Sequence, residues 1–234
     1  VPSRAAHTQG VKLAEELLRK ALQDQGDWPQ GLVVDLWGSA TMRTAGEEFA
    51  MALHLAGLAP VWDVGSGRVS GVEVVPLTLL NRPRIDVTLR VSGLFRDVFP
   101  GLATLFETGV AMLADREETA ADNPYATRTA RVYGPKPGQY GLGMGVALDA
   151  FTPEARAAAG EAWLAASSWA IGLDGQSRDD RAGLEARLRR ADSFVHAQDL
   201  TESDVLLAAD YAAHEAGFAA ALARLGAAKP ALYH

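Results

Sequence analysis

The segment NRPRIDVTLRVSGLFRDVFP, residues 81–100, contains the strand that decides the fold. Its run IDVTLRV, residues 85–91, alternates polar and apolar side chains, which is the period of a β-strand. Asp86, Thr88 and Arg90 fall on one face, and the other face is wholly apolar. A charge buried in a helix-covered sheet must be paired or face a cavity. We therefore expect these three side chains either to pair internally or to line a pocket.

Apolar runs on both sides of this strand predict further strands and helices. Residues 32–37, 61–62 and 72–77 have the composition of strands, and residues 65–71 that of a turn. Residues 4–25 and 47–58 have helical periodicity, and residues 38–46 between them are predicted to be a loop. The order strand, loop, helix, strand over residues 32–62 indicates a βαβ unit. In open α/β sheets ligands bind beyond the carboxyl ends of the strands, here the loops after Trp37 and Val91.

Three segments follow from these patterns. Residues 1–115 are predicted to form an α/β domain, with an open, mostly parallel sheet and flanking helices. Residues 116–150 form a long connection rich in Pro and Gly, and residues 151–234 a helix-rich segment in which Thr152 and Thr201 cap helices. The chain begins within helix-like sequence and stops at KPALYH, residues 229–234, which resembles the start of a strand. We expect it to be a fragment of a longer protein.

Composition excludes several classes of protein. The chain has 234 residues, of which 48% are hydrophobic, so a globular core can form. It lacks cysteine, which excludes disulfides and thiolate metal sites. The net charge of −7 argues against a nucleic-acid partner. No apolar run reaches the roughly 20 residues that span a bilayer, and no secretory signal is visible, so we expect a cytoplasmic protein without a membrane partner.

Histidine and carboxylate residues near the end of the chain are candidates for metal binding. His214 follows Asp210 by four residues on a predicted helix, and His196 lies close to Asp199. Together with Glu215 these residues could form a nitrogen and oxygen site that suits a borderline divalent metal. The alternative is that Asp210 and His214 form an ordinary helical i, i+4 pair, because two pairs of residues that are close in sequence do not by themselves make a metal coordination sphere.

Several ordered motifs resemble one known family. They are LWGSATMRTAGEE at residues 36–48, the segment at 81–100, RVYGPKPGQYGLGMG at 131–145, and ADSFVHAQDLTESDVLLAADYAAHEAGFAAALARLG at 191–226. All four resemble the large subunits of class I metal chelatases, which comprise the aerobic cobaltochelatase large subunit and the magnesium chelatase H subunit. DVTLRVSG, FVHAQD and HEAGF favour the cobalt branch. Family members often have an acidic pair and a Gly before RPRID, whereas this chain reads LTLLNRPRID. Any role of those family carboxylates therefore cannot be transferred to this chain.

The resemblance implies an enzyme, a ligase that forms nitrogen–metal bonds and that is inactive as a fragment. Such a subunit binds the tetrapyrrole and the metal, here Co2+ and hydrogenobyrinic acid a,c-diamide of cobalamin biosynthesis. AAA+ ATPase partner subunits use ATP and Mg2+, and the absence of a GxxxxGK[ST] motif in this chain agrees with that division. The alternatives are an H-type magnesium chelatase subunit acting on protoporphyrin IX, and a non-catalytic scaffold module that docks the ATPase subunits.

Metal insertion needs a base for the ring N–H protons, ligands for the metal and donors for the ring carboxylates. Asp86 and Glu73 are predicted catalytic bases or metal-handling carboxylates. His196 and His214 are predicted metal ligands on the delivery path. The predicted substrate-binding residues are Arg84, Arg90 and Arg96. The alternative for these arginines is internal pairing with Asp86 and Asp97.

Overall fold

One central sheet organises the structure, a computed structural model that describes residues 1–142, 152–196 and 209–234. Among these residues, seven strands form the sheet in the order β7-β6-β5-β4-β1-β8-β9. The neighbouring strands β5, β4, β1, β8 and β9 are parallel to one another. Strands β6 and β7 are added antiparallel at one edge of the sheet. The strands are β1 Leu32–Leu36, β4 Val87–Val91, β5 Val132–Gly134, β6 Trp169–Ile171, β7 Ser177–Asp179, β8 Ser193–His196 and β9 Ala231–Tyr233.

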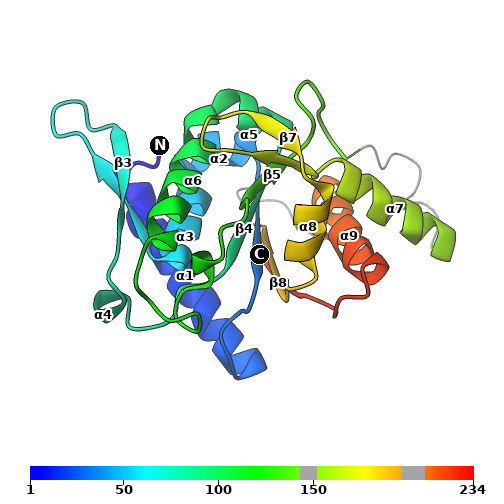
Figure 1. Cartoon of the computed structure of the whole chain (residues 1–234). Helices are drawn as coiled ribbons and strands as arrows, with labels where there is room; N and C mark the ends of the chain where they lie inside the picture. The colour runs from blue at the N-terminus through cyan, green and yellow to red at the C-terminus, as the bar shows by residue number, and fades with distance from the viewer. Residues whose placement is uncertain (143–151, 197–208) are drawn as a thin grey trace.

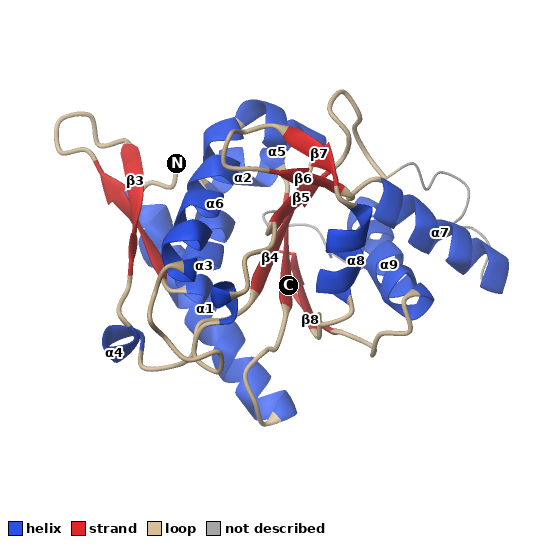
Figure 2. Cartoon of the chain, in the orientation of Figure 1, coloured by secondary structure: helices blue, strands red, loops and turns tan. Residues whose placement is uncertain are grey.

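Helices cover both faces of this sheet, α1, α3 and α6 on one side and α7, α8 and α9 on the other (Figures 1 and 2). The predicted α/β fold with a mostly parallel sheet is therefore confirmed. The helices are α1 Arg4–Gln25, α2 Gly38–Thr44, α3 Glu47–Ala56, α4 Leu77–Leu80, α5 Gly93–Val98, α6 Pro100–Ala114, α7 Pro153–Ala165, α8 Arg181–Leu188 and α9 Ala209–Arg224, with a 3-10 turn η1 at Pro124–Ala126. None of the helices in these described ranges has both the length and the apolar character needed to cross a bilayer.

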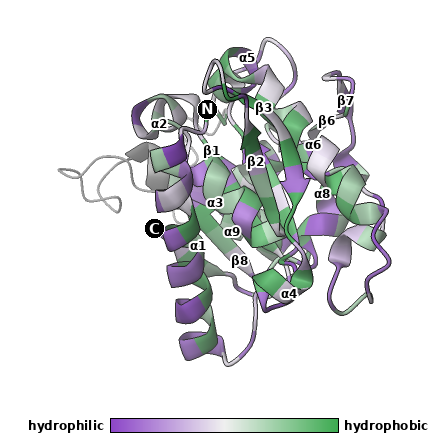
Figure 3. Ribbon diagram, turned by 90° about the vertical axis from the view of Figure 1, so that its left-hand side faces the viewer, coloured by the Kyte–Doolittle hydropathy of each residue, from purple (hydrophilic) through white to green (hydrophobic). Residues whose placement is uncertain are grey.

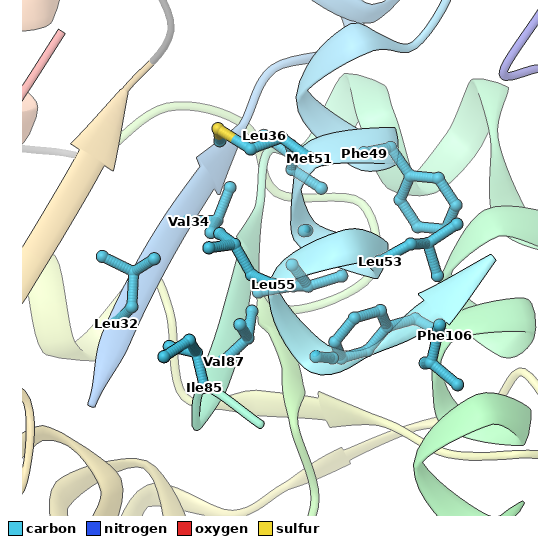
Figure 4. Packing of buried hydrophobic residues seen from close by; sticks show 14 of the residues in the cluster. Leu32, Val34, Leu36, Phe49, Met51, Leu53, Leu55, Ile85, Val87 and Phe106 are labelled. Atoms are coloured by element: carbon cyan, nitrogen blue, oxygen red, sulfur yellow. The ribbon is translucent and has the colours of Figure 1, made fainter. Parts of the chain in front are cut away.

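The apolar face of β1 and β4 packs against α3 and α6. Val34 and Leu36 of β1 lie beside Met51 and Leu55 of α3, and Phe106 of α6 closes the layer (Figure 4). All five side chains are almost completely buried. Burying a side chain of this size stabilises a fold by about 1.5–3 kcal/mol, so this layer holds the centre of the sheet.

The opposite face combines an apolar patch with polar residues. Val33 and Phe194 pack against Trp163 and Phe218, and the rings of Phe194 and Phe218 stack with their centroids 4.5 Å apart. The polar side chains of β4 predicted to share a face lie on this side of the sheet, beneath α8. They pair internally, which was one of the two expected outcomes.

The sheet crosses the predicted boundaries at residues 115 and 150. Strand β5 comes from the predicted connection, and β6 to β9 come from the segment predicted to be mainly helical. Strand β9 lies in the segment at residues 229–234 that was expected to begin a strand, whereas β5, β6 and β7 have only three residues each, which is too short for an alternating pattern to be recognised. Helix α7 begins after Thr152 as predicted, with the hydroxyl accepting from Ala155 N at 3.2 Å. Thr201 and Asp199 lie outside the described residues.

Two predictions around the first strand are wrong. Residues 38–46, predicted to be a loop, contain helix α2, which follows β1 after a single residue. Strand β2 (Leu58–Trp62) does not continue a βαβ unit but pairs antiparallel with β3 (Val69–Val74), outside the main sheet. Gly67, with φ of 66°, sits in the tight turn between these two strands. Closing the short loop of a hairpin costs less conformational entropy than closing the longer connection of a βαβ unit, which favours the hairpin.

Helix α1 is amphipathic and crosses α3 closely. Hydrophilic residues lie along the outer edge of its ribbon and hydrophobic ones along the edge toward the rest of the molecule (Figure 3), and its buried residues include Ala14, Leu17 and Leu18. Gly10 lies at the crossing point, where an added Cβ would come within 2.6 Å of the Glu47 carbonyl oxygen and 2.7 Å of Ala50 Cβ. The close approach of the two helices therefore requires glycine at this position.

A Gly10→Ala substitution is expected to destabilise the fold by about 1–3 kcal/mol, because the new methyl group forces the two helices apart. In an exposed helix the same change stabilises by about 0.5–1 kcal/mol. Gly101 of α6 offers that control, since an added Cβ there would meet nothing within 4 Å. The urea midpoints of the two variants should fall on opposite sides of the parent value. A higher midpoint for Gly10→Ala would contradict the packing argument.

Candidate functional site

A buried aspartate marks the carboxyl end of the central strand. Asp35 is the fourth residue of β1 and is 3% exposed. In the parallel register it lies beside Arg90 of β4 on one side and His196 of β8 on the other. Because register partners in a parallel sheet point to the same face, the three side chains form a row across three strands.

Four side chains converge on the Asp35 carboxylate. Its Oδ2 atom lies 2.9 Å from Trp37 Nε1, 2.9 Å from His196 Nδ1 and 3.0 Å from His214 Nδ1. Its Oδ1 atom lies 3.3 Å from Arg90 Nη1. His214 reaches this point from α9, so the site joins three strands of the sheet to one covering helix.

The charge of the site is concentrated on Asp35 and Arg90. Burial alone raises the pKa of an aspartate, but His214, Arg90 and the hydrogen bond from His196 outweigh it and hold the pKa of Asp35 well below its usual range. Burial lowers the pKa of His214, against the attraction of Asp35. The Asp35 carboxylate is therefore ionised at neutral pH.

Aromatic packing and one serine fix the loops around the site. The Trp37 ring centroid lies 4.7 Å from that of His196 and 4.8 Å from that of His214. Ser92, directly after β4, accepts hydrogen bonds at Oγ from Gly38 N at 3.2 Å and Phe95 N at 3.1 Å. These two loops were predicted to be the ligand-binding ends of the sheet, and the serine ties them together.

The predicted metal ligands His196 and His214 are brought together by the structure. Both are buried, and their ring centroids are 6.3 Å apart. Within the described ranges, no group of three or more histidine, cysteine, aspartate or glutamate residues has the geometry of a metal site. The two imidazoles alone therefore do not complete a coordination sphere, and their role as ligands stays a prediction.

Arg90 also belongs to the site, but its partner is Asp35 and not Asp86. Its Nε donates to Ser167 Oγ at 3.1 Å, and its Nη2 lies 3.4 Å from the carbonyl oxygen of Ala166. The side chain is 2% exposed, so its guanidinium is enclosed by the protein. In this structure Arg90 pairs with Asp35, and its role in binding a substrate carboxylate stays a prediction.

The predicted base Asp86 lies at the opposite, amino-terminal end of β4. Its Oδ1 forms ion pairs with both Arg131 and Arg187; Asp86 and Arg131 are buried and Arg187 is partly buried. Arg187 Nε also donates to Thr88 Oγ1 at 2.6 Å. Asp86 therefore lies at the opposite end of the strand from Asp35 and the two histidines, and its role as a base stays a prediction.

Two other predicted residues lie away from the histidines. Glu73 is exposed on β3, in the separate hairpin, and its role as a base stays a prediction. Arg84 forms a bidentate pair with Glu118, with Nε–Oε2 at 2.7 Å and Nη2–Oε1 at 2.8 Å. Its Nη1 donates to the carbonyl oxygen of Gly57 at 3.0 Å. Arg84 is thus engaged in holding the end of α3, and its role in substrate binding stays a prediction.

Arg96 lies near the carboxyl edge and pairs internally, the alternative expected for it. Its Nε donates to Asp97 Oδ1 at 2.7 Å, and its Nη1 donates to the carbonyl oxygens of Pro135 and Lys136, both at 3.0 Å. Its guanidinium also lies over the Tyr140 ring. Arg96 therefore anchors the loop after β5 to helix α5.

Sequence reasoning missed Asp35 and Trp37. One signal was present, because Asp35 is the single charged residue in the apolar run LVVDLW, residues 32–37. A charge in a buried parallel strand needs partners, as was argued for Asp86. The partner His196 lies 161 residues further along the chain, which no local pattern reveals.

Comparisons with known proteins agree with the motifs. The whole sequence, residues 1–234, matches the protein family described as CobN/Magnesium Chelatase. It is 41% identical to an aerobic cobaltochelatase subunit CobN of Sinorhizobium, over 100% of this chain and 20% of that subunit. It is 30% identical to a chloroplastic magnesium-chelatase subunit ChlH of rice, over 88% of this chain and 16% of that protein.

A solved structure gives the same result. The catalytic subunit of cobaltochelatase from Mycobacterium tuberculosis superposes with a TM-score of 0.91 and 33% sequence identity. The match covers 99% of this chain and 21% of that subunit, so the chain spans about a fifth of the length of these relatives. On sequence and fold together, the chain belongs to the CobN/Magnesium Chelatase family.

Proposed function

We propose that this chain is part of the large subunit of an ATP-dependent cobaltochelatase, a cytoplasmic ligase of cobalamin biosynthesis. The subunit binds the tetrapyrrole hydrogenobyrinic acid a,c-diamide and inserts Co2+ into it. AAA+ partner subunits supply the energy of ATP hydrolysis. Identity over the whole chain carries this proposal, since it is higher with the cobaltochelatase subunit than with the magnesium-chelatase subunit.

The site at the carboxyl edge of the sheet supports this chemistry. Two imidazoles share one carboxylate there, and imidazole nitrogen is a ligand that Co2+ accepts readily. In the proposal His196 and His214 handle the metal before insertion. Asp86 and Arg84 hold the fold together, because the groups that a ring or a metal would contact are occupied by ion pairs.

The full-length subunit that contains this sequence, combined with its ATPase partners, is expected to insert Co2+ into hydrogenobyrinic acid a,c-diamide only when ATP is present. Absorbance of the cobalt corrinoid product measures the reaction, with Mg2+ and protoporphyrin IX as the competing pair. Insertion of Mg2+ into protoporphyrin IX without cobalt activity would replace this proposal with the magnesium function.

The scaffold alternative is tested separately by binding. A subunit that takes part in ring binding should show tryptophan quenching on titration with the tetrapyrrole, without ATP or partner subunits. Trp37, which contacts both histidines, is the tryptophan at the proposed site. If Trp37→Phe leaves the quenching unchanged and substitutions of both histidines leave insertion unchanged, this part of the subunit acts as a scaffold.

A further inference from the structure

We propose that Tyr140, in the loop after β5, is a contact of the tetrapyrrole, and that the exposed face of its ring packs against the flat face of the macrocycle. The inference rests on the proposed chelatase function and deepens it by assigning a residue to the binding of the ring. Tyr140 lies in the motif at residues 131–145, one of the four that carry the family resemblance.

Tyr140 is both exposed and held in place. Among the aromatic side chains that the structure describes, only that of Tyr140 is largely exposed, at 63%. Its hydroxyl donates to Asp97 Oδ2. Its ring packs directly on Gly93, where an added Cβ would come within 2.7 Å of Tyr140 Cδ1 and 3.2 Å of Cε1. One side of the ring therefore rests on the start of α5, and the remainder is open to a ligand.

The loop that carries Tyr140 is fixed by its own turn and by an arginine. Gln139 N donates to the carbonyl oxygen of Lys136 at 2.9 Å. Pro137 and Gly138, with φ of 82° at the glycine, stand at the centre of this turn, as a type II turn requires. Arg96 Nη1 donates to the same Lys136 oxygen at 3.0 Å. A ring that is fixed before binding loses little conformational entropy when a ligand packs against it.

The ring lies at the end of the sheet where ligands bind in this architecture. Gly93, on which the ring packs, is the first residue of α5 and comes two residues after the end of β4. Ser92, just before it, accepts a hydrogen bond from Gly38 N, next to Trp37 of the candidate site. Tyr140 is therefore connected through backbone contacts to the loops after β1 and β4, at the carboxyl edge.

The surroundings of the ring suit a flat molecule with acidic edges. Leu94 beside it is 41% exposed and adds apolar surface. Lys136 is exposed, and the Arg96 guanidinium lies 5.8 Å from the Tyr140 ring centroid. Against these two cations stands one carboxylate, Asp97, which is engaged by both Arg96 and Tyr140. A conjugated ring that carries carboxylates, as hydrogenobyrinic acid a,c-diamide does, matches both the aromatic face and the excess positive charge.

The test titrates the full-length subunit with hydrogenobyrinic acid a,c-diamide, without metal, ATP or partner subunits, and follows the absorbance of the ring. Tyr140→Ala deletes the aromatic ring, whereas Tyr140→Phe keeps the ring and deletes only the hydroxyl that binds Asp97. Leu79→Ala is the matched control. It removes an apolar side chain that is 76% exposed on α4, at the opposite end of the molecule from α5 (Figures 1 and 3).

Tyr140→Ala is expected to bind the tetrapyrrole about 2–10-fold more weakly, the range that an aromatic contact contributes. Tyr140→Phe and Leu79→Ala should keep the parent affinity. Equal losses in Tyr140→Phe and Tyr140→Ala would overturn the inference, because the hydroxyl and not the ring face would then be responsible. Hydrogen exchange of α5 and β5 should stay at the parent rate in Tyr140→Ala, since Arg96 still holds the loop. Faster exchange there together with weaker binding would also overturn it, by assigning Tyr140 a purely structural role.

The same titration with protoporphyrin IX separates this inference from the proposed function. A subunit that binds only protoporphyrin IX, and binds it more weakly in Tyr140→Ala, would overturn the cobalt function and leave Tyr140 as a ring contact. Binding of hydrogenobyrinic acid a,c-diamide that Tyr140→Ala does not change would overturn the role of Tyr140 and leave the cobalt function standing.

Discussion

Asp86→Asn is expected to lower the local stability of the sheet by about 3–5 kcal/mol, a larger effect on the fold than that of Gly10→Ala. Asp86 is the shared partner of Arg131 and Arg187; Asp86 and Arg131 are buried, and Arg187 is partly buried. Removing its charge leaves two guanidinium groups without their counter-ion in a region shielded from water. The penalty for an uncompensated buried charge is larger than the net strength of the original pair.

Hydrogen exchange in the full-length subunit measures this effect locally. Peptides that cover β4 and α8 should exchange faster in Asp86→Asn, because both elements meet at this ion pair. Asp86→Asn/Arg187→Met, which also removes one stranded charge, should recover part of the protection. Thr88→Val is a milder control, since it deletes only the hydroxyl that accepts from Arg187.

The same variant decides between the two roles considered for Asp86. If the carboxylate is structural, cobalt insertion per folded molecule stays near the parent value at a temperature where Asp86→Asn remains folded. Normal protection from exchange together with lost insertion would contradict the ion-pair role. Asp86 would then be restored as a base.

The strand at residues 85–91 shows how far the sequence could be interpreted. Its alternation correctly placed Asp86, Thr88 and Arg90 on one face, since period is a local property. The choice between internal pairing and a pocket depended on Arg131 and Arg187, which lie 45 and 101 residues from Asp86. No local pattern contains that information.

The histidines show the complementary case. His196 and His214 were selected as metal-handling residues from local spacing and from the family resemblance, and the structure does bring them together. Their common partner Asp35 was overlooked, because it is one residue in an apolar run and its neighbours come from distant strands. The short strands β5, β6 and β7 were missed for a related reason, since each gains its stability from the sheet and has little pattern of its own.

His214→Ala is expected to reduce cobalt insertion by about 10–100-fold, the largest loss of activity expected from a single substitution in this chain. His214 reaches Asp35 from α9 and lies 8% exposed. Its removal takes away one of the two imidazoles that face the shared carboxylate. The substitution also leaves space beside the Trp37 ring, so stability must be measured together with activity.

His54→Ala provides the matched control for that measurement. His54 is also a helical histidine in contact with a carboxylate, with Nε2 at 2.7 Å from Glu15 Oε1, but it belongs to α3 and its partner is largely exposed. An exposed pair of this kind contributes about 0–1 kcal/mol, so both stability and insertion should stay close to the parent values. If His54→Ala and His214→Ala reduced insertion equally, the loss would reflect a general effect of removing helical histidines. A selective loss in His214→Ala, with Co2+ affinity reduced in parallel and hydrogen exchange of β1 unchanged, would place the metal at the carboxyl edge of the sheet.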